Sequence, residues 1–339
     1  MTGTGPLPAA LAPVAHLAAI AYGAGVRVRN LLWDHRAAAR SGVPVVSIGN
    51  VAVGGTGKSP FVRWTVERLR DAGHRPMVAL RGYGARDGLS DEAEEHRAML
   101  PGTTVAVGGD RIASIRAARA ADPAIDCVVL DDGFQHRALA RDLDIVLVDA
   151  SRPALDGPLL PAGWLREPAS SLRRAGLVVV TRADAVDPRI SALVERFHGK
   201  PPAAWTRHEW TRIERFGAGG RDMPIDALAG SKVVCVSALA NPASFVDEAS
   251  RRGARVRADL RFRDHHAFTA SDASRIAAAA RSHDAAVLCT GKDWAKLSRL
   301  VHDPAGVEWL VVRAGIRFVA GEDAVRARLA ALFPARKFL

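Results

Sequence analysis

The chain has 339 residues, of which 48% are hydrophobic and 24% are charged, so it can bury one large core or two moderate ones. Lysine and arginine outnumber aspartate and glutamate by 47 to 36, which gives a formal net charge of +11 and favours anionic partners. This composition excludes a chain too polar to fold, but the scattered charge leaves nucleic acid, an anionic membrane surface and a phosphorylated substrate open.

The N-terminal segment has no Lys, Arg, Asp or Glu in its first 26 residues. Its apolar part, residues 7–26, approaches the length that spans a bilayer, although prolines and glycines interrupt it. A secretory signal would carry positive charge before the apolar run, whereas here Arg27, Arg29, Arg36 and Arg40 follow it. Two interpretations stay open: a helix embedded in a membrane face with its arginines among anionic headgroups, or a helix that packs on the protein core.

The next part of the chain alternates short apolar runs with amphipathic stretches. Helical stretches are expected at 59–72 and 110–121. The β-branched runs lack the alternation of a half-exposed strand, so they predict a parallel sheet covered by helices on both faces, an α/β fold. These predicted strands are residues 43–49, 76–80, 104–107, 126–130, 143–149 and 176–181.

A change of composition separates this region from a second series. Residues 205–230 are polar and glycine-rich, which is typical of a hairpin or connector, and further strands are expected at 232–239, 285–290 and 307–314. The predicted organisation is an N-terminal membrane-associated helix, a P-loop NTPase-like domain with a mostly parallel sheet, a connector, and a second, smaller α/β domain. Their predicted ranges are 1–40, 41–210, 211–230 and 231–339.

The cysteines lie apart from one another. Cys127, Cys235 and Cys289 are each inside an apolar run, and the chain has no C-x-x-C spacing. This pattern argues against metal or redox roles and indicates buried thiols in a reducing compartment.

The stretch "SIGNVAVGGTGKSPF" (47–61) ends like a phosphate-binding loop. A buried strand precedes it and an amphipathic helix follows, the context in which backbone N–H groups and a helix N-terminus bind phosphates. Lys58 would reach the β- and γ-phosphate oxygens and Ser59 would bind Mg²⁺. Ala52 stands where the usual pattern has its first glycine, and a small residue can serve there if its φ is negative. The predicted nucleotide-binding residues are Ala52, Val53, Gly54, Gly55, Thr56, Gly57, Lys58 and Ser59.

An acidic pair closes another apolar run in "CVVLDDGFQH" (127–136). Carboxylates at the C-terminal end of a parallel strand face the crevice in which open α/β sheets bind ligands. We therefore expect Asp131 and Asp132 to hold Mg²⁺ or to act on a nearby water or substrate hydroxyl. Asp-Asp-Gly is also good turn chemistry, which is the alternative.

Seven motifs in order resemble those of the tetraacyldisaccharide 4'-kinases, the lipid A 4'-kinases of Gram-negative bacteria. The match covers about residues 43 to 297. The motifs are "GNVAVGGTGKSP" (49–60), "LRGYG" (80–84), "DDGFQH" (131–136), "LLPAGWLREP" (159–168), "TRAD" (181–184), "NPASF" (241–245) and "DHHAF" (264–268).

The resemblance implies transfer of the γ-phosphoryl group of ATP to the 4'-hydroxyl of a tetraacylated glucosamine disaccharide 1-phosphate, giving lipid IVA, at the cytoplasmic face of the inner membrane. It also implies that Asp131 and Asp132 work with Mg²⁺, and that Asp91 pairs with His265 to activate the hydroxyl. The chain departs from the family where it reads Ser90-Asp91-Glu92-Ala93 instead of Gly-Asp-Glu-Pro.

Three more residues are candidates for binding the substrate. Arg166 can grip the 1-phosphate or the transferred group, because a guanidinium binds phosphate bidentately, with a solvated surface arginine as the alternative. Gln135 and His136 follow the acidic pair into the expected crevice.

His265 and His266 are adjacent and would point to opposite faces of an extended chain, which disfavours a shared zinc ion. His265 is then either an acid–base residue or a structural histidine.

Rival functions differ from this hypothesis in their motifs. A membrane-associated P-loop ATPase acting on a protein partner would carry an additional lysine near the start of the loop, where Ala52 and Val53 stand. A nucleic-acid-binding protein would show stacking aromatics, a helix-turn-helix or zinc spacing, and none is present in the sequence. In "TGKDW" (290–294), Asp293 directly follows Lys292, which argues against the base-reading loop of a guanine-nucleotide switch.

Overall fold

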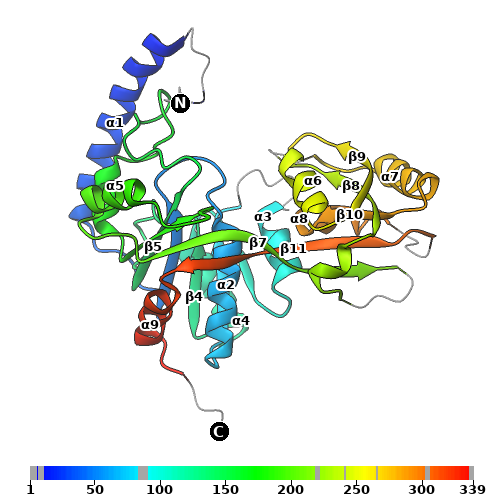
Figure 1. Cartoon of the computed structure of the whole chain (residues 1–339). Helices are drawn as coiled ribbons and strands as arrows, with labels where there is room; N and C mark the ends of the chain where they lie inside the picture. Colours follow the sequence, from blue (N-terminus) through cyan, green and yellow to red (C-terminus); the bar gives the residue numbers. More distant parts are fainter. Residues whose placement is uncertain are drawn as a thin grey trace. The chain divides into compact units, whose positions relative to one another are not determined.

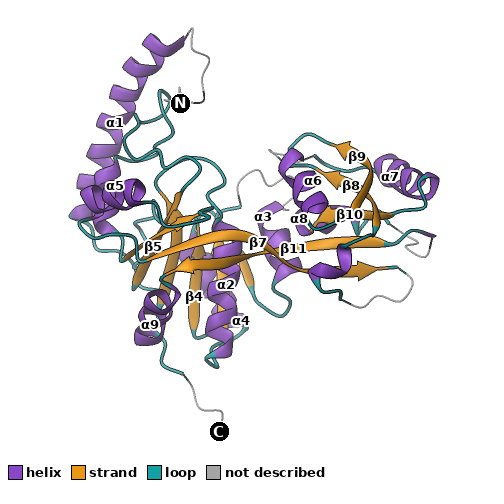
Figure 2. Cartoon of the chain, viewed as in Figure 1, coloured by secondary structure: helices purple, strands orange, loops and turns teal. Residues whose placement is uncertain are grey.

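The chain forms two compact units in the computed structural model, which describes residues 6, 11–82, 91–217, 222–239, 242–264, 266–301 and 306–335. Unit 1 consists of Met1–His208 with Ile316–Leu339, and unit 2 of Glu209–Gly315. Helices and strands alternate along the chain in both (Figures 1 and 2). The α/β class predicted from the sequence is confirmed.

Unit 1 contains a parallel sheet whose strands follow the order β3-β2-β4-β1-β5-β6-β7. Strand β1 lies between β4 and β5, so the carboxyl ends of these three strands meet at one edge of the sheet. The strands are β1 (Val45–Asn50), β2 (Pro76–Leu80), β3 (Val105–Val107), β4 (Cys127–Asp131), β5 (Leu143–Asp149), β6 (Leu177–Thr181) and β7 (Ala204–Phe216).

Helices cover both faces of this sheet, because successive side chains of a strand point to opposite sides and both sets are apolar. In β1, Val46 and Ile48 pack in one core cluster and Val45 in another. The first cluster includes side chains of α2 (Lys58–Asp71), α3 (Asp91–Met99) and α9 (Glu322–Leu332). The opposite face packs against α4 (Arg111–Ala121) and, under β5 and β6, against α5 (Pro188–His198).

The C-terminal segment belongs to unit 1, unlike the predicted assignment of all of 231–339 to the second domain. Strand β11 (Trp309–Ala320) continues beyond the predicted strand 307–314 and enters unit 1 at Ile316. There the ring of Phe318 lies 4.9 Å from that of Trp64, measured between centroids. Val325, Leu329 and Phe333 then complete the core cluster of α2, which explains why the chain returns.

Unit 2 contains parallel strands in the order β11-β10-β8-β9. They are β8 (Lys232–Ser237), β9 (Arg255–Arg261), β10 (Ala286–Thr290) and β11, with helices α6 (Pro242–Arg251), α7 (Ala270–Ser282) and α8 (Gly291–Leu297). The predicted connector contributes the second half of β7 and an antiparallel bridge between Ile213 and Met223.

Helix α1 (Ala12–Asp34) contains residues 12–26 of the charge-free segment and runs on through Arg27 and Arg29. Buried small residues face the rest of unit 1 at Ala15, Ala19 and Gly23. Val26 is buried as well, whereas most of the large apolar side chains of the helix are exposed, namely Val14, Leu17, Ile20, Tyr22, Val28, Leu31 and Leu32. Within the described part of the chain, no helix combines the length and hydropathy needed to cross a membrane.

Polar contacts hold α1 to the body of unit 1. The buried carboxylate of Glu167 accepts hydrogen bonds from Arg29 Nη2 at 3.0 Å and from Asn30 Nδ2 at 3.2 Å. The Tyr22 hydroxyl donates to the backbone oxygen of Arg166 at 2.8 Å, and Arg137 pairs with Asp34 at 2.6 Å. The helix is therefore anchored on one side while its apolar side chains stay on the surface.

Candidate nucleotide-binding site

The predicted strand, glycine-rich turn and helix are present at the edge of unit 1. Strand β1 ends at Asn50 and α2 begins at Lys58, with Gly57 before it in the left-handed region at φ 81°. The positive φ favours glycine, and with a β-carbon at this position the ring of His208 would have to move, because its Nε2 would lie too close. The first turn of α2 has no acidic residue, and its free N–H groups suit an anion.

Hydrogen bonds hold the loop in one shape. Thr56 is buried, and its hydroxyl accepts a hydrogen bond from Asn50 Nδ2 at 3.0 Å. The backbone oxygen of Thr56 accepts a second hydrogen bond from Thr181 Oγ1 at 2.8 Å. Gln135 Nε2 donates to the backbone oxygen of Asn50 at 2.8 Å. Gln135, expected to contact the substrate, therefore supports the end of β1 in this structure.

The start of the loop explains why alanine can replace the usual first glycine. Ala52 forms an antiparallel bridge with Leu165, and Arg166 N donates to the backbone oxygen of Val51 at 2.7 Å. Ala52 is not among the described non-glycine residues with positive φ. The "WLREP" segment thus pairs with an extended loop start, and extended backbone carries no penalty for a side chain.

Two basic side chains meet at Asp132, the residue after β4. Lys58 Nζ lies 3.4 Å from Asp132 Oδ1, and Arg166 Nη1 donates to Asp132 Oδ2 at 2.8 Å. Burial acts to raise the pKa of Asp132, but the charges of Lys58 and Arg166 outweigh it and lower that pKa. Arg166 is therefore part of the charged cluster instead of a solvated surface arginine.

Asp131 lies behind this cluster as the last residue of β4. It is 3% exposed, and its Oδ2 lies 2.7 Å from Nε2 of His96, which is fully buried in α3. Burial acts to lower the pKa of His96, but the hydrogen bond to Asp131 and its charge outweigh burial and raise it.

The donor set fits Mg²⁺. Asp131 Oδ1 is buried without a hydrogen-bond partner, and Ser59 offers a hydroxyl in the first turn of α2. Carboxylate and hydroxyl oxygens are the hard ligands that Mg²⁺ prefers. The residues available to hold the ion are those predicted: Ser59, Asp131 and Asp132.

The remaining predicted residues are only partly described. Asp91 begins α3, but its side chain is outside the description, and His265 lies outside the described residues. His136 is half-buried, its Nε2 has no hydrogen-bond partner, and burial followed by Arg111 lowers its pKa to about 4. The roles of Asp91, His265 and His136 stay predictions.

Sequence reasoning did not single out two histidines near the loop. His96 has the buried contact described above, and His208 stands against Gly57. Neither histidine belongs to one of the seven motifs.

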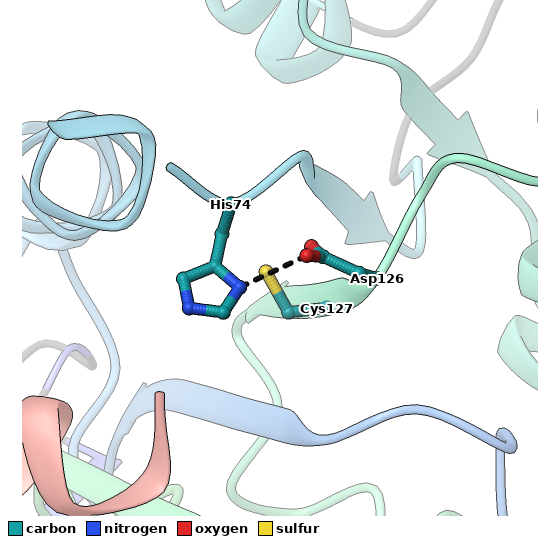
Figure 3. A group of neighbouring side chains, drawn as sticks. All are labelled: His74, Asp126 and Cys127. Atoms are coloured by element: carbon teal, nitrogen blue, oxygen red, sulfur yellow. Dashed lines mark hydrogen bonds and ion pairs between the residues drawn. The ribbon is translucent and has the colours of Figure 1, made fainter. Parts of the chain in front are cut away.

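A separate cluster lies at the opposite end of β4 (Figure 3). The ligand atoms of His74, Asp126 and Cys127 lie within 4.8 Å of one another. His74 Nδ1 contacts Asp126 Oδ2 at 2.9 Å, and the thiol of Cys127 also hydrogen-bonds to Asp126. A metal ion would have to displace these bonds, so the cluster reads as structural. All three cysteines are free and buried, as predicted.

Comparisons with known proteins agree over most of the chain. A family described as Tetraacyldisaccharide-1-P 4'-kinase matches residues 8–334. A tetraacyldisaccharide 4'-kinase of Anaeromyxobacter dehalogenans (strain 2CP-C) is 40% identical over 350 residues, covering 96% of this chain and 92% of that relative. One of Chlorobium luteolum is 33% identical over 346 residues, covering 93% and 96%. The solved "apo" form of LpxK from Aquifex aeolicus in complex with ATP is similar with a TM-score of 0.72 and 26% identity, covering 96% of this chain and 98% of that one.

Proposed function

The chain belongs to the tetraacyldisaccharide-1-P 4'-kinase family, and we propose that the loop 52–59 with Asp131, Asp132 and Arg166 forms its phosphoryl-transfer site. Family membership makes the chain an ATP-dependent kinase of lipid A biosynthesis. The observation that carries the site assignment is the meeting of Lys58 and Arg166 on Asp132 beside the loop. Phosphoryl transfer needs this kind of fixed charge more than covalent chemistry.

In the proposed reaction, the 4'-hydroxyl oxygen of the tetraacyldisaccharide 1-phosphate attacks the γ-phosphorus of ATP. The bond from that phosphorus to the β–γ bridging oxygen breaks and ADP leaves. The loop N–H groups and Lys58 hold the phosphates, and Arg166 neutralises charge on the transferred group. Ser59, Asp131 and Asp132 would hold Mg²⁺, which would neutralise negative charge on the phosphates. Lys58 also contacts Asp132, so the phosphates of ATP would share its ammonium group with that carboxylate.

We propose that His265 accepts the proton of the 4'-hydroxyl group and that Asp91 orients the imidazole of His265. A sugar hydroxyl has a very high pKa, so its proton leaves during attack, and an imidazole near neutrality can accept it. The family resemblance of the "SDEA" and "DHHAF" segments supports this assignment. His136, with its unpartnered Nε2, remains a candidate contact for the disaccharide.

We also propose that α1 binds the cytoplasmic face of the inner membrane. Its exposed apolar side chains and the arginines around its C-terminal end suit an interfacial helix among anionic headgroups. A double substitution, Leu17→Glu with Ile20→Glu, should shift the protein from sedimenting vesicles with anionic lipid to the soluble fraction. Unchanged sedimentation would remove α1 as the anchor.

The decisive experiment for the function uses labelled ATP and Mg²⁺ with three acceptor conditions: tetraacyldisaccharide 1-phosphate, RNA, or no acceptor. We expect label in the lipid alone. Rapid release of labelled phosphate without acceptor, together with an unlabelled lipid, would favour the ATPase that acts on a protein partner.

A further inference from the structure

A buried contact between α3 and the end of β4 fixes one of the acidic residues of the site. We propose that His96 is a positioning residue that holds Oδ2 of Asp131, so that Oδ1 of the same carboxylate is presented to the metal ion of the kinase. The inference rests on the proposed function, in which Asp131 is a metal ligand.

The geometry of the pair restricts the carboxylate to one orientation. The Nε2–Oδ2 distance of 2.7 Å lies in the range of a charge-assisted hydrogen bond, and both side chains are almost completely buried, at 1% and 5% exposed. The backbone is held as well, because Arg111 Nη2 donates to the backbone oxygens of Asp131 and Asp132 at 3.3 and 3.2 Å. With one oxygen committed to the ring, only Oδ1 remains for a ligand.

Each residue of this pair has one buried polar atom without a hydrogen-bond partner, and the free carboxylate oxygen indicates a ligand. Asp131 Oδ1 and His96 Nδ1 are both buried and have no hydrogen-bond partner. A buried polar atom without a partner is costly, and most such atoms in proteins are bonded. An unpartnered carboxylate oxygen at the carboxyl end of a strand next to the phosphate loop is in the place where a cation would be bound. Partners that orient a ligating side chain through its other atom are a regular part of metal sites.

The same hydrogen bond, together with the packing of Ala93 in the core, holds α3 against the sheet. His96 follows Glu92 by four residues, so both side chains share one face of the helix. That helix begins at Asp91, the proposed partner of the acceptor base. Holding α3 at its middle therefore also sets the position from which Asp91 acts.

The test compares two substitutions that are alike in polarity but differ in reach. The amide nitrogen of His96→Gln can occupy the place of Nε2 and keep the donor, whereas the shorter side chain of His96→Asn cannot reach Oδ2. Binding of Mn²⁺ to the protein with a non-hydrolysable ATP analogue is measured by electron paramagnetic resonance, together with turnover against Mg²⁺ concentration. We expect His96→Asn to weaken metal affinity by about 10–100-fold and His96→Gln to stay within a few-fold of the wild type.

Controls separate this inference from its premise. His74→Gln alters the other histidine–aspartate pair of β4 and should leave Mn²⁺ affinity unchanged. Asp131→Asn should weaken it at least as much as His96→Asn. If Asp131→Asn binds Mn²⁺ normally, the proposed role of Asp131 as a ligand is wrong. If Asp131→Asn loses affinity but His96→Asn does not, or if Gln fails to rescue what Asn loses, the positioning role of His96 is overturned while the proposed site stands.

Discussion

Strand β4 has a histidine–aspartate pair at each end, and the two pairs differ in how completely their polar atoms are bonded. At the amino end, His74 contacts Asp126 at 2.9 Å through Nδ1 and the backbone oxygen of Pro334 at 3.1 Å through Nε2. The second oxygen of Asp126 accepts from Arg75 N at 2.9 Å. At the carboxyl end, His96 and Asp131 share one hydrogen bond and each keeps one buried atom without a partner.

This difference supports the proposal that the amino-end pair is structural and the carboxyl-end pair functional. Buried polar groups in native proteins are normally bonded, and the amino-end pair meets that expectation while joining β4 to the C-terminal segment. The carboxyl-end pair leaves capacity for a ligand at the edge where parallel α/β sheets bind their substrates. Substitutions at the carboxyl end should therefore change catalysis, and those at the amino end should change stability.

The largest effect is expected for the proposed acid–base pair, Asp91 and His265. Asp91→Asn and His265→Ala should each lower kcat by roughly 10²–10⁴-fold with little change in ATP affinity, because general base catalysis contributes about that much. The double variant should be scarcely slower than either single one, since residues that act as a unit are not additive. Steady-state kinetics with the lipid acceptor checks this, and losses that add strictly in the logarithm of kcat would show that the two act separately.

The next largest effect is expected for Lys58→Ala, which should lower the rate of phosphoryl transfer by about 10²–10³-fold. Removal of one preorganised charge contact typically costs that much. The variant should remain folded. Asp132 loses its contact with Lys58 but keeps its ion pair with Arg166. Circular dichroism and label transfer from ATP test the two halves of this expectation. Near-normal turnover would mean that the loop does not hold the nucleotide.

The sequence predicts the core of this site because its signals are local. Residues 76–80 and 143–149 are found as strands with the predicted bounds, since unbroken apolar runs identify strands buried on both faces. The family identified from the seven motifs is confirmed. The roles given to individual residues, such as Arg166 and His265, stay predictions.

Other features depend on contacts between distant parts of the chain. His96 meets a residue 35 positions later, and nothing in its charged helix indicates which strand end it faces. Edge strand β9 was not predicted, because Arg255, Arg257 and Arg261 place exposed charge along it. The return of α9 to unit 1 follows from packing of Val325 and Leu329 that no local pattern specifies.

On the structural side, His74→Leu should lower the free energy of unfolding by about 1–3 kcal/mol, because it removes the hydrogen bonds of the imidazole to Asp126 Oδ2 and to the Pro334 carbonyl. Turnover and Mg²⁺ dependence should stay near those of the wild type. Urea unfolding and steady-state kinetics measure the two effects side by side. A large fall in kcat without loss of stability would contradict the division of β4 into a structural and a catalytic end.

The smallest effect is expected in how the free energy of unfolding falls at low pH, where Asp126 at the amino end of β4 becomes protonated. Burial acts to raise the pKa of Asp126, but hydrogen bonds from His74 and Arg75 outweigh it and lower the pKa below the ordinary value of 3.8. A carboxyl group whose folded pKa is lowered stabilises the fold at pH above its unfolded pKa, and that contribution is lost as pH falls through the folded pKa. The wild type should therefore lose stability more steeply than Asp126→Asn below about pH 4, since the amide does not titrate. Urea unfolding of both proteins from about pH 5 to about pH 3 gives the free energy of unfolding of each as a function of pH. In the difference between these two curves, the titrations of other sites cancel. Parallel curves would mean that the histidine at this end of β4 does not stabilise the charged carboxylate, and the contrast between the two ends would then rest on the carboxyl-end pair alone.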